Sequence, residues 1–103
     1  MASKITSINT SSSAAQSFPS DSGIPFGGNT RTIAIQGTFA SGTIKISASY
    51  DGGTNFITLT DADGSDIAIT ADSIVNIALG TGVKIRFDVT GVSGTMDVEI
   101  YMA

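Results

Sequence analysis

The chain reads Val83-Lys84-Ile85-Arg86-Phe87-Asp88-Val89, with an apolar side chain at each odd-numbered position and a charged one at each even-numbered position. Side chains along a β-strand point alternately to its two faces, so this pattern predicts a strand with one buried face. The stretch 96–102 repeats the pattern, because Met96, Val98, Ile100 and Met102 alternate with two acids and a tyrosine. The chain therefore ends on a second strand of the same kind.

Shorter alternating stretches precede these two strands, and glycine-containing turns separate them at a spacing typical of antiparallel sheets. The positions expected to face the core are Ile33, Ile35, Ile44, Ile46, Ala48, Tyr50, Ile57, Leu59, Ile67, Ile69, Val75, Ile77 and Leu79. No segment shows a helical period. The sequence predicts an all-β fold, either an antiparallel β-sandwich or a jelly-roll-like barrel of about seven strands.

The clearest turn is Asp51-Gly52-Gly53-Thr54, which predicts a hairpin because glycine accepts positive φ angles without a Cβ clash. The return strand is expected over residues 55–60. In this strand Ile57 and Leu59 would face inward and Phe56 would lie on the opposite face.

The composition changes near Thr30. Eight serines fall between Ser3 and Ser22, and the apolar residues of this region are isolated. Such a segment is not expected to form its own core, so the chain is predicted to be one domain, a β-sandwich (30–103), preceded by a Ser-rich extended arm (1–29). Residues 4–9 have a second interpretation, as a short edge strand.

Five residues of the arm are candidate anchors on a partner surface, because proline lowers the entropy cost of holding an extended chain. These candidate interface residues are Phe18, Pro19, Ile24, Pro25 and Phe26. The alternative for residues 1–17 is a disordered tail. If the arm is separate, its removal should abolish attachment and leave folding intact.

Charged residues make up only 14% of the 103 residues, against about 25% in ordinary soluble domains. The surface is therefore expected to be largely Ser, Thr, Gly and Asn, or to be covered by a partner. The net charge of −4 disfavours a nucleic-acid partner, since phosphates would be repelled. No membrane partner is expected either, because no apolar run approaches the ~20 residues of a span and the first eight residues do not form a secretory signal.

The chain has no His, no Cys and a single Glu, Glu99, so the usual routes to an activated nucleophile are closed. A Ser-Lys pair stays open in principle, but all three lysines lie in patterns that predict exposure. We therefore expect no catalytic residues, no enzymatic activity and no cofactor.

Three carboxylates, Asp61, Asp63 and Asp66, are the best candidates for a metal site, since hard cations prefer oxygen ligands. Their spacing does not match an EF-hand loop. Asp and Gly are also the usual residues of turns, so a turn without metal is the preferred interpretation.

Residues 37–103 resemble a group of small tailed-phage virion proteins. The matching features are the strand and hairpin of residues 42–56, which contain Asp51-Gly52-Gly53-Thr54, the segments 75–79 and 80–86, and Val89-Thr90-Gly91-Val92-Ser93-Gly94-Thr95 before the last strand. The chain departs from the pattern at Phe56, where a Trp is expected, and the Ser-rich arm has no counterpart.

The resemblance implies a capsid decoration or cement protein, located on the outer capsid surface after synthesis in the host cytoplasm. Its partner would be the major capsid protein, and it would form a homo-oligomer, with a trimer at local three-fold positions favoured. Two alternatives stay open: a head- or tail-fibre module that recognises a host-surface glycan, and an unrelated carbohydrate-binding module. Independently of the resemblance, Tyr50, Phe56 and Tyr101 are candidates to line a carbohydrate or protein contact, although aromatic residues on strands more often serve ordinary packing.

Overall fold

The computed structural model describes residues 2–20 and 22–103, which form ten strands and no helix. The strands are β1 (Ser3–Thr10), β2 (Gln16–Phe18), β3 (Ile24–Pro25), β4 (Asn29–Thr38), β5 (Thr43–Ser49), β6 (Ile57–Thr58), β7 (Ala68–Ile69), β8 (Ser73–Leu79), β9 (Lys84–Thr90) and β10 (Met96–Met102). Within these described ranges there is consequently no helix long and apolar enough to cross a membrane.

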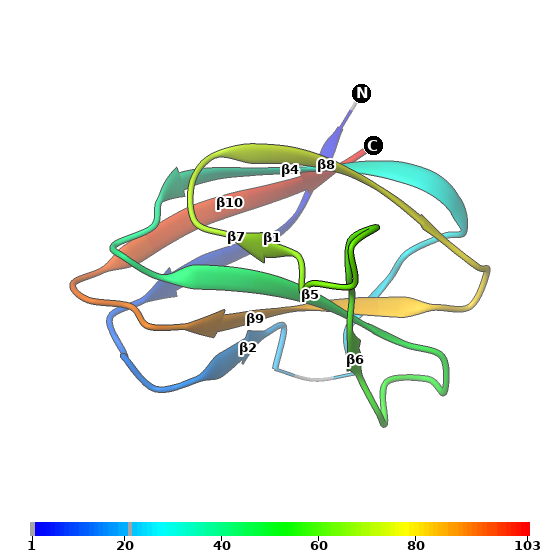
Figure 1. Cartoon of the computed structure of the whole chain (residues 1–103), viewed down its shortest axis with the longest axis horizontal. Coiled ribbons are helices and arrows are strands. Elements are labelled where there is room, and N and C mark those ends of the chain that lie inside the picture. Colours follow the sequence, from blue (N-terminus) through cyan, green and yellow to red (C-terminus); the bar gives the residue numbers. More distant parts are fainter. Residues whose placement is uncertain (1, 21) are drawn as a thin grey trace.

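The strands form two antiparallel sheets that lie one above the other (Figure 1). The four-stranded sheet has the order β1-β10-β4-β8. The six-stranded sheet has the order β2-β9-β5-β6, with β3 also paired to β9 and β7 to β5. The predicted all-β class is confirmed, and the arrangement is compatible with a β-sandwich. The jelly-roll alternative and the expected strand count are not confirmed.

The core lies between the two sheets and is formed by the alternating positions of their strands. In β9 the side chains of Ile85, Phe87 and Val89 are buried, as the charged residues between them predict. All four apolar positions of β10 are buried in the same way. The inward positions of β4 (Ile33, Ile35) and of the first half of β5 (Ile44, Ile46) are buried as well. Burial of these methyl-rich side chains is the main favourable term in the folding free energy.

Two positions expected to face inward are exposed, and both predictions are wrong. Tyr50 follows the end of β5 and is 73% exposed, while Ile57 in β6 is 61% exposed. The predicted return strand is reduced to the two residues of β6, which lies at the edge of its sheet. β6 therefore has a neighbouring strand on one side only, which leaves Ile57 uncovered. Of the two positions expected to face inward in residues 55–60, only Leu59 packs against the core.

The N-terminal residues are part of the two sheets, which differs from the predicted arm. β1 pairs with β10 along its length, from Ser3 opposite Met102 to Thr10 opposite Met96, and Ile8 is fully buried. β2 and β3 both pair with β9. β4 begins at Asn29, one residue before the boundary predicted at residue 30. Met1 and Asp21 of the predicted arm lie outside the described residues.

The physical reason is that an edge strand needs apolar side chains on one face only. The exposed positions of β1 are Ser3, Lys4, Ser7 and Asn9, and Ile8 with the half-buried Ile5 supplies the apolar contact to the core. A few apolar residues therefore suffice when the rest of the sheet provides the partner surface. The alternative of an edge strand over residues 4–9 is the one that agrees with the structure.

Candidate functional site

The five predicted anchors do not form an exposed binding segment. Phe26 is fully buried, and Phe18 and Ile24 pack against the same core. Pro19, which follows Phe18 through a cis peptide bond, is half-buried, and Pro25 alone is exposed. Phe26 is therefore a core residue, and its assignment as an interface anchor is wrong.

Hydrogen bonds also tie this segment to the rest of the molecule. The Phe26 N–H donates to the carbonyl of Val83 at 2.9 Å, and the guanidinium of Arg31 donates to the Phe26 carbonyl at 2.6 Å. Ser22, earlier in the same segment, lies against the turn after β5. A Cβ at Gly53 would collide with the Ser22 backbone, so glycine is needed at this position for the two backbones to lie so close together. The segment is thus held between β9 and the turn after β5.

The turn 51–54 is organised by the carboxylate of Asp51. It accepts hydrogen bonds from the backbone N–H groups of Thr54 and Asn55, at 3.2 and 3.0 Å, and from the hydroxyl of Ser49 at 2.7 Å. The Asn55 amide adds a further bond at 2.8 Å. The Asn55 N–H, the Ser49 hydroxyl and the other donors favour the charged form, so the pKa of Asp51 lies well below its ordinary range. Asp51 therefore has a structural role.

A second polar cluster covers the outer face of the six-stranded sheet. The Asp88 carboxylate accepts hydrogen bonds from Arg86 at 2.7 Å and from Ser17 at 2.8 Å, and it also accepts one from Ser47. The Arg86 guanidinium stacks over the ring of Phe56, 4.1 Å from its centroid. Ser47 is buried beneath this cluster. The sequence alone does not reveal that burial, because a serine between apolar positions is read as exposed.

The three aspartates considered as metal ligands belong to a turn. The Asp61 carboxylate accepts hydrogen bonds from the N–H groups of Asp63 and Ser65, at 2.9 and 3.1 Å. Asp66 makes a 3.0 Å salt bridge with Lys45. Among the described residues no group of three or more potential ligands converges on one point. The interpretation as a turn accounts for the positions of these side chains.

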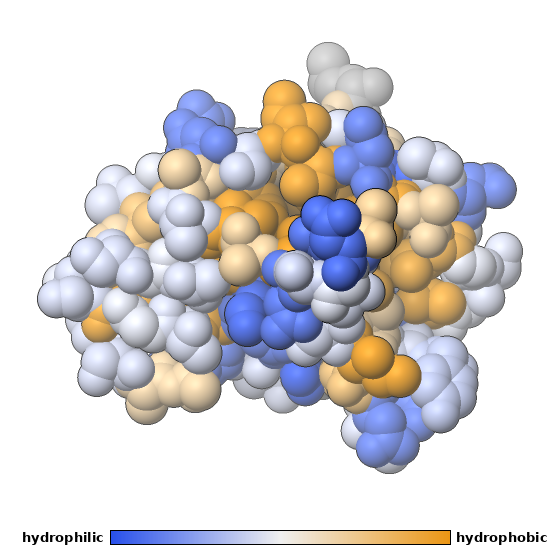
Figure 2. Space-filling view, in the orientation of Figure 1, coloured by the Kyte–Doolittle hydropathy of each residue, from blue (hydrophilic) through white to orange (hydrophobic). Residues whose placement is uncertain are grey.

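The basic residues are likewise dispersed, and four of the five have polar partners. Lys45 pairs with Asp66 and Arg86 with Asp88, while Arg31 donates to a carbonyl and Lys84 lies 3.4 Å from the hydroxyl of Ser22. Folding does not gather them into a basic surface that would suit phosphates. Figure 2 shows one face of the molecule, where apolar groups lie among hydrophilic ones and no single kind of residue covers the face.

The outer face of the four-stranded sheet carries the most distinctive surface. Strand register places Lys4, Tyr101, Ala34 and Ile74 in one transverse row across all four strands. Ile74 is 73% exposed, and Ala34 and Tyr101 are half-buried. We call Tyr101, Ala34 and Ile74 the apolar row. One sequence signal pointed to it: Ile74 stands next to Val75, and adjacent apolar residues in a strand cannot both face the core.

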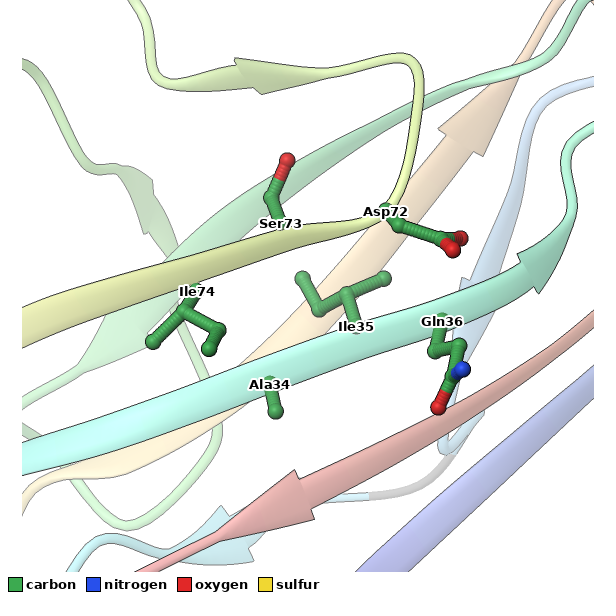
Figure 3. Close-up of a pocket in the computed structure, with 6 residues that line it drawn as sticks. All are labelled: Ala34, Ile35, Gln36, Asp72, Ser73 and Ile74. Atoms are coloured by element: carbon green, nitrogen blue, oxygen red, sulfur yellow. The ribbon is translucent and has the colours of Figure 1, made fainter.

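Two shallow hollows adjoin the apolar row. The first, of about 500 Å³, is lined by Ala34, Gln36, Asp72 and Ile74 among others (Figure 3). In this hollow the carboxylate of Asp72 accepts a 3.0 Å hydrogen bond from the Gly37 N–H. The second, of about 300 Å³, shares Gln36 and is lined by polar groups.

The second hollow includes the carboxylate of Glu99, which accepts a 2.7 Å hydrogen bond from the Tyr101 hydroxyl. This bond and the charge of Glu99 raise the pKa of the Tyr101 phenol. Of the three aromatic residues considered for a contact, Tyr101 is the one on this face. Tyr50 and Phe56 lie in the connection between β5 and β6 of the other sheet, so the structure does not bring the three together.

In chemical terms the described residues hold no paired general acid and base in a deep cleft. The carboxylates of Asp51, Asp61 and Asp88 are already engaged with neighbouring donors, and the hollows are open to solvent. These arrangements suit non-covalent binding over a broad surface.

Compared with protein-family models, with curated protein sequences and with solved structures, the chain has no significant match in any of the three. The resemblance of residues 37–103 to tailed-phage virion proteins therefore stays a prediction.

Proposed function

We propose that this chain is a non-enzymatic virion structural protein, a capsid decoration or cement protein that binds the outer capsid lattice and stabilises it. Its partner is the major capsid protein, its location is the outer surface of the particle, and copies assemble into a homo-oligomer, with a trimer at local three-fold positions favoured by the resemblance. The fold that carries this role is a β-sandwich.

The observation that carries the proposal is the apolar row on the outer face of the four-stranded sheet. Ile74, at 73% exposed, adjoins Ala34 on the next strand, and the two line a hollow with only one charged residue, Asp72. Exposed apolar side chains rimmed by polar ones are typical of protein contact surfaces. Since the N-terminal segment is folded into the sheets, contact with the capsid is assigned to this face.

The proposal is tested by reconstituting particles that lack the protein. Wild-type protein at saturating concentration should raise the temperature at which the particles open, because a ligand of the assembled shell shifts the equilibrium toward it. Ile74→Asp should bind particles at least tenfold more weakly. Ile57→Asp is the matched control, since Ile57 is 61% exposed in the other sheet.

Both substitutions are at exposed positions, so neither should change folding appreciably. Equal opening temperatures of bare and decorated particles would contradict the cement function. Equal binding by the Ile74→Asp and Ile57→Asp variants would show that the apolar row does not contact the capsid. The cement function would then have to use another surface of the protein.

The alternative is a head- or tail-fibre module that recognises a host-surface glycan. The observation in its favour is the second hollow, where Gln36, Asp97 and Glu99 supply hydrogen-bonding groups of the kind that bind sugar hydroxyls. Binding of the free protein to host cells, lost in Glu99→Gln, together with no effect on particle stability would favour this alternative over cement.

A further inference from the structure

The free edge of β8 differs from every other sheet edge in the described part of the chain. β8 is seven residues long, Ser73–Leu79, and contains no charged residue, no proline and no glycine. It pairs with β4 on one side only. An uncharged edge strand of this length is a ready template for another strand, and proteins usually guard against that.

The other edges are guarded by recognised features. β1 carries Lys4 and an irregularity in its pairing with β10 between Lys4 and Thr6. β2 has only three residues and is followed by Pro19, and β3 contains Pro25. β6 and β7 have two residues each. Short strands, proline, lysine and bulges all hinder pairing with a further strand, so β8 is the edge left open.

The hydrogen-bonding groups that β8 offers can be identified from the neighbouring ladder. The N–H and C=O of Thr32 in β4 bond to Ala103, on the β10 side. Since these groups alternate in direction along a strand, Arg31 and Ile33 direct theirs toward β8, opposite Ile77 and Val75. The groups of Ile74, Asn76 and Ala78 therefore point away from β4, to the free edge.

A cleft of about 560 Å³ lies beside this edge. Val75 and Asn76 of β8 line one side, and residues 60–61 and 66–68 line the other, with Ile67 supplying apolar surface. The ionisable side chains that line it are Asp61 and Asp66. Lys45 is the cation paired with Asp66, so the loop that carries the three aspartates keeps an excess of negative charge.

We propose that β8 binds an extended strand of a partner protein that carries a lysine or arginine on the side facing the cleft. The backbone of this strand pairs with Ile74, Asn76 and Ala78, which is strand addition to an open edge. The alkyl stem of the basic side chain packs on Val75 and Ile67 while its charged end reaches the carboxylates of Asp61 and Asp66, which both line the cleft. Under the proposed function the strand belongs to the capsid protein, and only this assignment rests on that function.

The charges argue against a second copy of this chain as the occupant. A copy pairing through its own β8 brings no basic side chain, because residues 73–79 are uncharged. It also brings a second acidic loop to the same flank, and like charges held close together oppose association. A strand of a partner protein that carries a basic residue can pair with the free backbone groups of β8 and also place a positive charge beside the acidic side chains of the cleft.

The test uses the full chain and a defined peptide, Thr-Val-Thr-Lys-Thr-Val-Thr, acetylated and amidated at its ends. The peptide should shift the backbone amide NMR signals of Ile74, Asn76 and Ala78 at low ionic strength. The same peptide with glutamate in place of lysine should bind at least tenfold more weakly. A version methylated on alternate backbone nitrogens, which cannot pair with an edge, should not bind.

On the protein side, Ala78→Pro removes an outward N–H and keeps the ladder to β4, so it should weaken binding at least tenfold. Ala78→Ser, which keeps the N–H, is the matched control, and Asp66→Asn should weaken only the lysine peptide. Equal binding of the lysine and glutamate peptides, or no binding of either, would overturn the proposal. So would dimerisation of the free protein that Ala78→Pro abolishes, which would make a second copy the occupant.

The two proposals fail separately. Particles that still take up the Ala78→Pro variant with wild-type affinity would exclude strand addition from the capsid contact and leave the cement function intact. If the protein binds the peptide at β8 but never attaches to particles, strand addition to β8 is retained and the cement function is excluded.

Discussion

The inclusion of β1 in the four-stranded sheet makes Ile8 a core residue, and its replacement should destabilise the whole fold. Ile8→Ala removes three carbon atoms from a side chain with no exposed surface. At about 0.8 kcal/mol per buried methylene the transfer loss is about 2.4 kcal/mol, and the cavity left behind adds to it. We expect a loss of about 2.5–4 kcal/mol in the free energy of unfolding. This is a large share of the 5–15 kcal/mol that is typical of a domain.

The assay is urea unfolding followed by circular dichroism, with the thermal melt as a second measurement. A loss of this size should lower the melting temperature by at least about 10 °C in a domain of this length. Ser7→Ala is the control, because Ser7 lies on the exposed face of the same strand and should change stability by less than about 0.5 kcal/mol. Equal midpoints for the two variants would mean that β1 does not belong to the cooperative fold, and the separate arm would then be the better description.

Four further outcomes are expected. Phe87→Ala should cost about 3–5 kcal/mol in urea unfolding, since the ring is fully enclosed, and an unchanged midpoint would show that the register of β9 is wrong. Asp51 has a depressed pKa in the fold, so its stabilising contribution is present above its ordinary pKa of about 4 and is lost as the pH falls toward the depressed value. Amide hydrogen exchange in the turn 51–55 should therefore accelerate as the pH is lowered below about 4. The Asp51→Asn variant should lack this pH dependence. Glu99→Gln should lower the pKa of the Tyr101 phenol in an ultraviolet titration, and an unchanged titration would contradict the hydrogen bond between them. Chelators should leave the melting temperature unchanged, whereas a drop of several degrees that calcium reverses would reveal a metal site at the turn around Asp61.

The strands that the sequence predicts best are those in which charged residues separate the apolar ones. In β9 the residues Lys84, Arg86 and Asp88 leave one choice of buried face, and the structure has that face buried. The turn at residues 51–54 is also predictable, because glycine and Asp are used there for local reasons. Local patterns therefore suffice where the determining interactions lie within a few residues.

The position of the first 29 residues is not predictable in the same way. A Ser- and Thr-rich stretch with isolated apolar residues has the composition of a disordered arm. Whether it joins a sheet depends on whether β10 and β9 present free edges, and those edges exist only after the rest of the chain has folded. The burial of Ile8 and Phe26 is for this reason a tertiary property.

The apolar row is likewise not predictable from the sequence alone. The pair Ile74-Val75 indicates that one apolar residue faces outward, but the alignment of Ile74 with Ala34 and Tyr101 depends on the register of two pairs of strands. Burial of Ser47 depends on contacts with Asp88, 41 residues later in the chain. Sequence patterns predict which face of a strand is buried, and the structure is needed to show which exposed residues meet.

The described part of the chain satisfies most of its polar groups internally. No buried side-chain nitrogen or oxygen in residues 2–20 and 22–103 lacks a hydrogen-bond partner, and Asp51, Asp61 and Asp88 each hold a loop or face together. Against this background the edge of β8 departs from the rule that the other described edges obey, and Ile74, like Tyr50 and Ile57, is a large apolar side chain left exposed. Departures of this kind tend to mark functional surfaces. Because both lie on β8, one partner can use them together, its strand extending the four-stranded sheet and its neighbouring side chains covering the outer face at Ile74.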